Sequence, residues 1–108
     1  MLIQQGDVLF HKIDKLPDNV VPVKPEFGRF VFARGEVTGH AHTTAANLGR
    51  IEVFEDAVDR VLYAVCHEDV IVRHEEHKQV KLPAGTKFKI GIVEEVDPFT
   101  EEVRKVSD

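Results

Sequence analysis

The sequence predicts an all-β fold: a small antiparallel β-barrel or sandwich with a short C-terminal helix. Three observations lead to this prediction. Apolar and polar residues alternate with a period of two through most of the apolar segments, as expected of strands with one buried face. These segments are rich in Val, Ile and Phe, which favour strands. Gly, Pro, Asn and Asp interrupt them at short intervals, which is typical of domains built from several short strands.

About seven or eight strands are expected in total, as in small barrels and sandwiches. The first follows Gly6 over residues 7–13 and ends at the turn-forming residues of 14–19. The next segment, 20–28, contains two prolines. Because proline lacks a backbone donor, we expect an edge strand or an extended loop there. A strand-like run then covers 29–35 and ends at a glycine.

The second half of the chain provides the remaining strands. Residues 50–56 alternate between the two faces of a strand. The β-branched and aromatic runs 60–68 and 69–76 predict two more strands with a break between them. Residues 78–96 contain two further strands, joined near the Pro-Ala-Gly of 83–85.

The last residues of the chain depart from the strand pattern and predict a short helix. Thr100 is a suitable N-cap, and acidic residues follow it in the first turn. Arg104 and Lys105 lie in a later turn, and Val103 and Val106 then face the same side.

Length and charge restrict the function classes. With 108 residues and no linker, we expect one β-domain over residues 1–108. The net charge of −5 argues against a nucleic-acid-binding protein. No signal peptide and no apolar run of about 20 residues occurs, so no membrane association and a cytoplasmic location are expected. The single cysteine, Cys66, is expected to be a buried strand residue.

Four of the six histidines form two pairs that could hold a metal ion. His40 and His42 are two residues apart, so on a strand both rings project from one face. His74 and His77 are three apart, and their rings can converge across a tight turn. We therefore predict a divalent transition-metal site made by these four histidines. The alternative, solvated histidines that order a loop and a turn, stays open.

Imidazole ligands suit zinc, iron, nickel or copper, and zinc is the first expectation. Glu36, Glu75 or Glu76 could add an oxygen ligand. Four bound histidines would close the site and make it structural, whereas three would leave a position open for water or substrate. His11 and His67 are expected to be ordinary strand histidines, and Asp7 an ordinary turn residue.

The first histidine pair partly resembles the cupin barrel. Gly35 and the His40-Ala41-His42 sequence are similar to the first cupin motif, although Asn47 stands where a glutamate is expected. Pro83-Ala84-Gly85 is similar to the turn of the second motif, but Phe88 occupies its histidine position. The resemblance covers about half of the chain and implies a metalloenzyme that activates water or dioxygen.

A second resemblance spans nearly the whole chain. The motifs QGDVLF, GEVTGHAH, HEEH and LPAG, together with the last residues, are similar to a family of small uncharacterised proteins from bacteria and their phages. This resemblance transfers no activity, but it implies that the two histidine stretches belong to one design.

Three hypotheses therefore stand: a metal-binding β-domain, a non-enzymatic phage-related accessory or assembly protein without metal, and a cupin-like metalloenzyme. Whether the protein is an enzyme is undetermined, no catalytic residue is assigned, and no organic cofactor is expected. Apolar runs such as 29–32 provide material for an exposed sheet edge. Homo-oligomerisation through such an edge is expected.

Overall fold

The computed structural model describes residues 1–34, 39–47, 49–96 and 103–105, and this part of the chain consists of strands and turns without a helix. All pairings between neighbouring strands are antiparallel. The predicted all-β class with antiparallel sheets is therefore confirmed.

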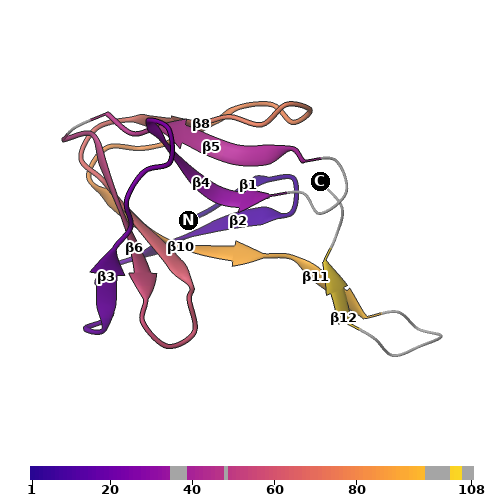
Figure 1. Ribbon diagram of the computed structural model, residues 1–108, viewed down its shortest axis with the longest axis horizontal. Coiled ribbons are helices and arrows are strands. Elements are labelled where there is room, and N and C mark those ends of the chain that lie inside the picture. Colours follow the sequence, from indigo (N-terminus) through magenta and orange to yellow (C-terminus); the bar gives the residue numbers. More distant parts are fainter. Residues whose placement is uncertain (35–38, 48, 97–102, 106–108) are drawn as a thin grey trace.

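The largest element is a six-stranded sheet (Figure 1). Its strands, in spatial order, are β1 (Leu2–Gln5), β2 (Val8–Ile13), β10 (Thr86–Ile92), β7 (Leu62–Cys66), β6 (Ile51–Asp56) and β3 (Val20–Pro22). Strand β10 lies between β2 and β7, so the last strand of this sheet joins the first hairpin of the chain to its middle.

Three antiparallel pairs accompany this sheet. They are β4 (Arg29–Arg34) with β5 (Ala41–Ala45), β8 (Val70–Val72) with β9 (Val80–Leu82), and β11 (Glu94–Val96) with β12 (Val103–Lys105). An isolated bridge between Thr43 and Arg73 links β5 to the end of β8. This contact brings the two histidine-bearing segments together.

The core forms between the six-stranded sheet and two of the pairs, β4–β5 and β8–β9. In β2 the side chains of Val8 and Phe10 are fully buried while His11 is exposed, as the alternating pattern predicts. The Phe10 ring packs edge-to-face on Phe32 of β4 and on Phe88 of β10, with centroid distances of 5.4 and 6.4 Å.

A β-bulge in the β4–β5 pair adjusts the register beside the site. Val31 lies opposite Thr43, but Ala33 lies opposite His42, so Phe32 is an extra residue in β4. Bulges of this kind change which way neighbouring side chains point. The bulge allows Phe32 to fill the core while His42 of the partner strand also points inward and is fully buried.

The sheet does not close into a barrel. Within the described residues, its outer strands β1 and β3 are unpaired on one side. The barrel alternative of the prediction is therefore wrong, because the described sheet is open. The segment 20–28, expected to be an edge strand or loop, indeed contributes the edge strand β3, which ends at Pro22. Pairing of copies through an edge stays a prediction.

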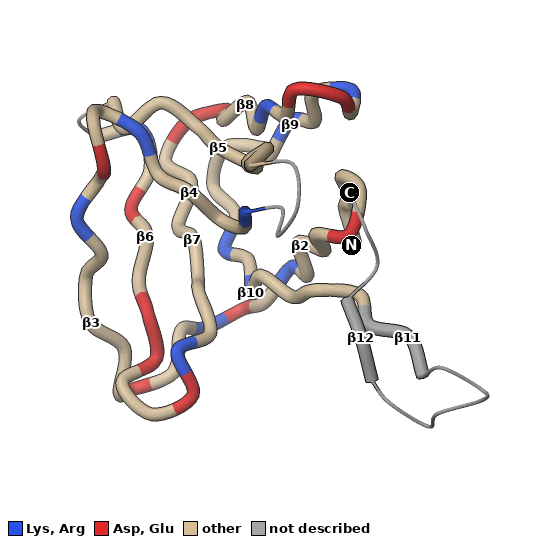
Figure 2. Tube along the Cα trace, turned by 45° about the vertical axis from the view of Figure 1, so that its right-hand side comes forward, with Lys and Arg blue, Asp and Glu red and all other residues tan. Residues whose placement is uncertain are grey.

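The predicted C-terminal helix lies mostly on residues 97–102 and 106–108, outside the described part of the chain. Between them, Val103–Lys105 pair with Glu94–Val96 as β12. No helix long and apolar enough to cross a membrane was found among the described residues. Lys and Arg are interspersed with Asp and Glu along the chain (Figure 2).

Candidate metal centre

The rings of the four predicted histidines lie together. His42 is the second residue of β5, and His40 lies just before that strand. His74 and His77 lie in the connection between β8 and β9. Ring centroids are 4.4 Å apart for His42 and His74, 4.6 Å for His74 and His77, 5.6 Å for His40 and His74, and 6.1 Å for His42 and His77. The two sequence pairs are therefore one cluster in space.

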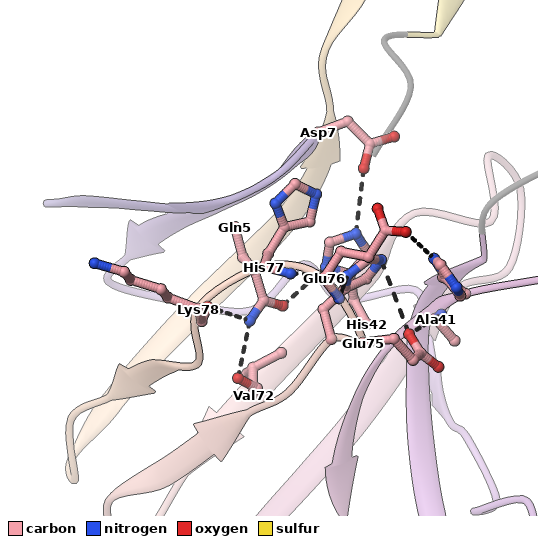
Figure 3. A network of polar contacts seen from close by, with 11 residues as sticks. Gln5, Asp7, Ala41, His42, Val72, Glu75, Glu76, His77 and Lys78 are labelled. Atoms are coloured by element: carbon pink, nitrogen blue, oxygen red, sulfur yellow. Dashed lines mark hydrogen bonds and ion pairs between the residues drawn. The ribbon is translucent and has the colours of Figure 1, made fainter. Parts of the chain in front are cut away.

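The His42 ring is completely buried, and a glutamine fixes its orientation (Figure 3). Gln5 Nε2 donates hydrogen bonds to the carbonyl oxygens of Val72, at 3.0 Å, and Lys78, at 2.9 Å. Its Oε1 is consequently the acceptor that faces His42 Nδ1 at 2.8 Å. His42 Nδ1 therefore carries a proton, and in the neutral ring Nε2 presents its lone pair.

His74 has the opposite arrangement. The backbone N–H groups of Glu76 and His77 both donate to His74 Nδ1, at 3.0 and 3.3 Å. In the neutral ring the proton is then on Nε2. A metal ion needs a nitrogen lone pair, so ligation by His74 would require the turn at 74–77 to give up these hydrogen bonds. His42 and His74 are thus not equivalent, although their rings touch.

Glu75 and Glu76 extend the cluster toward solvent. One ligand atom each of His40, His74 and Glu75 lies within 4.8 Å of the others. The Ala41 amide donates to Glu75 Oε2 at 3.0 Å. This hydrogen bond is the largest cause that lowers the pKa of the Glu75 carboxyl, followed by its own backbone N–H. Glu36, the third predicted oxygen donor, lies outside the described residues.

The turn between β1 and β2 supplies residues that the sequence analysis did not assign to the site. Asp7 is 9 % exposed, and its Oδ1 lies 3.3 Å from His42 Nε2. Gly6 has a φ of +56°, and a Cβ atom there would lie 2.6 Å from His77 Nε2. The residue types of the QGD motif are those of an ordinary turn, but this turn lies directly against the histidine cluster.

The other residues with reactive side chains lie outside the cluster, as predicted. His11 is exposed on β2, and exposed His67 contacts Glu52 Oε2 at 2.8 Å. Cys66 is buried in the core, and burial raises the pKa of its thiol to about 11. A thiol of this kind is protonated and inert at neutral pH.

A small hollow opens beside the cluster on its outer side. Its volume is about 220 Å³, and its lining includes Thr43, Arg73 and Glu75. The Arg73 guanidinium donates to Gln79 Oε1 at 3.4 Å. Arg73 and His74 thus line the same hollow.

Residues 4–91 match the family described as "Domain of unknown function (DUF8820)". The chain belongs to the DUF8820 family. The matched segment of this DUF8820 protein includes the QGD turn, both histidine pairs and the core strands. Comparison with curated proteins gave no match. Comparison with solved structures gave none either.

Proposed function

We propose that this DUF8820 protein binds one divalent transition-metal ion, zinc first, at the cluster of His40, His42, His74 and His77. The observation that carries the proposal is the convergence of four imidazole rings from two distant segments. Neighbouring centroids in the cluster are 4.4–5.6 Å apart. Clusters of imidazoles with carboxylates nearby are the usual ligands of zinc, iron and nickel in proteins.

The surroundings of the rings support a built site over a chance surface cluster. The side chains of His42 and His74 have no solvent exposure, and that of His40 is 26 % exposed. Buried polar rings are retained where hydrogen bonds orient them. The amide of Gln5 orients His42, and the backbone of the turn orients His74. An acceptor such as Gln5 Oε1, placed at the ring nitrogen away from the ion, usually fixes the ring of a metal ligand.

A cupin-like metalloenzyme is the second candidate, and the hollow beside Thr43, Arg73 and Glu75 favours it. An ion with an open coordination position could bind a small ligand there. The cupin resemblance itself gives less support. Phe88, which stands at the histidine position of the second cupin motif, is fully buried in the core and offers no ligand atom.

Elemental analysis of protein purified without an affinity tag or added metal tests the proposal. The wild type is expected to contain close to one equivalent of zinc, iron or nickel, and the double variant His40→Ala, His74→Ala is expected to have lost it. The matched control is the double variant His11→Ala, His67→Ala, which also removes two imidazoles but leaves the cluster intact. It should retain the metal.

The state of the fold separates the possible roles of the ion. Loss of metal with an unchanged circular dichroism spectrum would indicate a functional site, and loss of both would indicate a structural ion. A wild type without metal even after reconstitution with zinc, iron and nickel would reject both metal hypotheses. The non-enzymatic accessory or assembly protein would then remain, and the search would turn to partners.

A further inference from the structure

A buried carboxylate faces the buried end of the histidine cluster. Asp7 Oδ1 and His42 Nε2 are 3.3 Å apart, and the side chains are 11 % and 0 % exposed (Figure 3). Among the described residues, none donates a hydrogen bond to Asp7 Oδ1. A buried anionic oxygen without a donor is costly, so its position requires an explanation.

The proton of His42 does not supply that donor in the neutral ring. Because Gln5 Oε1 accepts from Nδ1, the lone pair of Nε2 is directed to the side of Asp7. Two acceptors then face each other in a place that water does not reach. A positive centre between them removes the repulsion, and it is either a second ring proton or a metal cation.

The separation of the two atoms favours the cation. A proton shared in a charge-assisted hydrogen bond brings nitrogen and oxygen to about 2.7–2.9 Å, whereas Asp7 Oδ1 and His42 Nε2 are 3.3 Å apart. Two ligand atoms at about 2.0–2.1 Å from zinc, with a tetrahedral angle between them, lie about 3.3–3.4 Å from each other. The pair is therefore spaced as two ligands of one ion.

Burial distinguishes this pair from a similar one nearer the surface. His40 Nδ1 and Glu76 Oε1 are 3.5 Å apart, but the Glu76 side chain is 58 % exposed. Water can satisfy the carboxylate of Glu76, and its spacing from His40 therefore indicates no ligand. The Oδ1 atom of Asp7 has no such access.

We propose that Asp7 is a ligand of the metal ion, through Oδ1, beside Nε2 of His42, and that Gln5 is the residue that positions His42 for this role. The inference rests on the proposed metal-binding function and extends the site to the turn between β1 and β2. His77 Nε2, a buried atom with no hydrogen-bond partner among the described residues, lies against the same turn. Asp7 thereby adds one carboxylate to the imidazoles of the proposed site.

This ligand set narrows the class of metal. A carboxylate oxygen beside imidazole nitrogens suits zinc and ferrous iron, and does not suit cuprous copper, which prefers sulfur ligands. The ion then binds close to the buried end of the cluster, between Asp7 and His42.

The test compares Asp7→Asn with Asp14→Asn, which removes the same charge at an exposed position just after β2. Zinc affinity is measured by competition with a chelating dye, and the visible absorption of the Co²⁺-loaded protein reports the ligands. Asp7→Asn is expected to weaken zinc binding by about tenfold or more and to change the Co²⁺ spectrum. Asp14→Asn should change neither.

Two outcomes would overturn the inference, and they differ in what they say of the proposed function. If the wild type binds zinc and Asp7→Asn has the same affinity and Co²⁺ spectrum, Asp7 is not a ligand, but the histidine site stands. If the wild type binds neither Zn²⁺ nor Co²⁺, both proposals are wrong.

A second measurement applies if Asp7→Asn does not fold. Long-range ¹H–¹⁵N spectra of the wild type, recorded before and after addition of zinc, identify the nitrogen that binds the ion. His42 Nε2 is expected to become metal-bound while Nδ1 keeps its proton and its bond to Gln5. A zinc ion bound at Nδ1, or a His42 ring that keeps both of its protons in the zinc-loaded protein, would overturn the inference.

Discussion

Replacement of Gly6 by alanine tests how closely the β1–β2 turn fits the histidine cluster. The φ of Gly6 is +56°, and a Cβ atom would lie 2.6 Å from His77 Nε2 and 3.3 Å from His42 Cε1. A left-handed conformation costs an alanine about 1–2 kcal/mol. In a domain of about 100 residues this corresponds to a fall in Tm of roughly 5–10 °C.

The contact with His77 adds an effect on metal binding. To restore ordinary contact at 3.4 Å, the ring must move by about 0.8 Å, which exceeds the tolerance of about 0.2 Å in metal–ligand distances. We therefore expect Gly6→Ala to reduce zinc affinity at least about tenfold, in addition to its effect on Tm. Thermal unfolding of the apoprotein and zinc titration measure the two effects separately.

Gly85→Ala is the matched control for this prediction. Gly85 also has a positive φ, +77°, but a Cβ atom there would meet nothing within 4 Å. The control should lose stability and keep its zinc affinity. Equal zinc affinities for Gly6→Ala and Gly85→Ala would refute the reasoning, because the contact between the turn and His77 would then have no consequence for the site.

Three further predictions concern the rest of the fold. Backbone hydrogen bonds from Val58 and Asp59 lower the pKa of Asp56, so the stabilising effect of its carboxylate is present above about pH 4 and is lost as the pH falls through the folded-state pKa. The Asp56→Asn variant should therefore be less stable at pH 7, and its urea midpoint should decline less steeply in acid than that of the wild type. An equally steep decline in both proteins would contradict this prediction. Because burial raises the pKa of the Cys66 thiol to about 11, the folded protein should react with a disulfide reagent at pH 8 far more slowly than the urea-unfolded chain. Equal reaction rates would show that the Cys66 thiol is not buried. Phe88 is fully buried, so Phe88→Ala should lower the free energy of unfolding by about 3–5 kcal/mol, and a loss under about 1 kcal/mol in urea titrations would show that the core is packed differently.

The hydrophobic pattern predicted most of the fold because most strands bury one apolar face. The strands at 8–13, 51–56 and 86–92 follow the predicted alternation. Strand β5 was not among the predicted strands, although the HxH spacing was considered on a strand. Its sequence AHTTA has His42 and Thr44 on the buried side, so the side that faces inward is polar and gives no hydrophobic signal.

The site could be predicted only in part for a related reason. The spacing of the two histidine pairs indicated a common centre, because imidazoles are recognisable ligands. Gln5 and Asp7 stand in a motif whose residue types are those of any turn. Their roles depend on the pairing of β1 with β2 and on the approach of this hairpin to the 74–77 turn, which no local pattern encodes.

The cluster joins three segments of the chain that are far apart in sequence: residues 5–7, 40–42 and 74–77. An ion that binds all three would be bound by the folded chain alone, so the free energy of binding would add to the free energy of folding. At a free concentration 100 times its Kd, such an ion contributes about 2.7 kcal/mol. The melting temperature would thus report the availability of free metal, and withdrawal of the ion would loosen first the seam where Thr43 and Arg73 join β5 to β8.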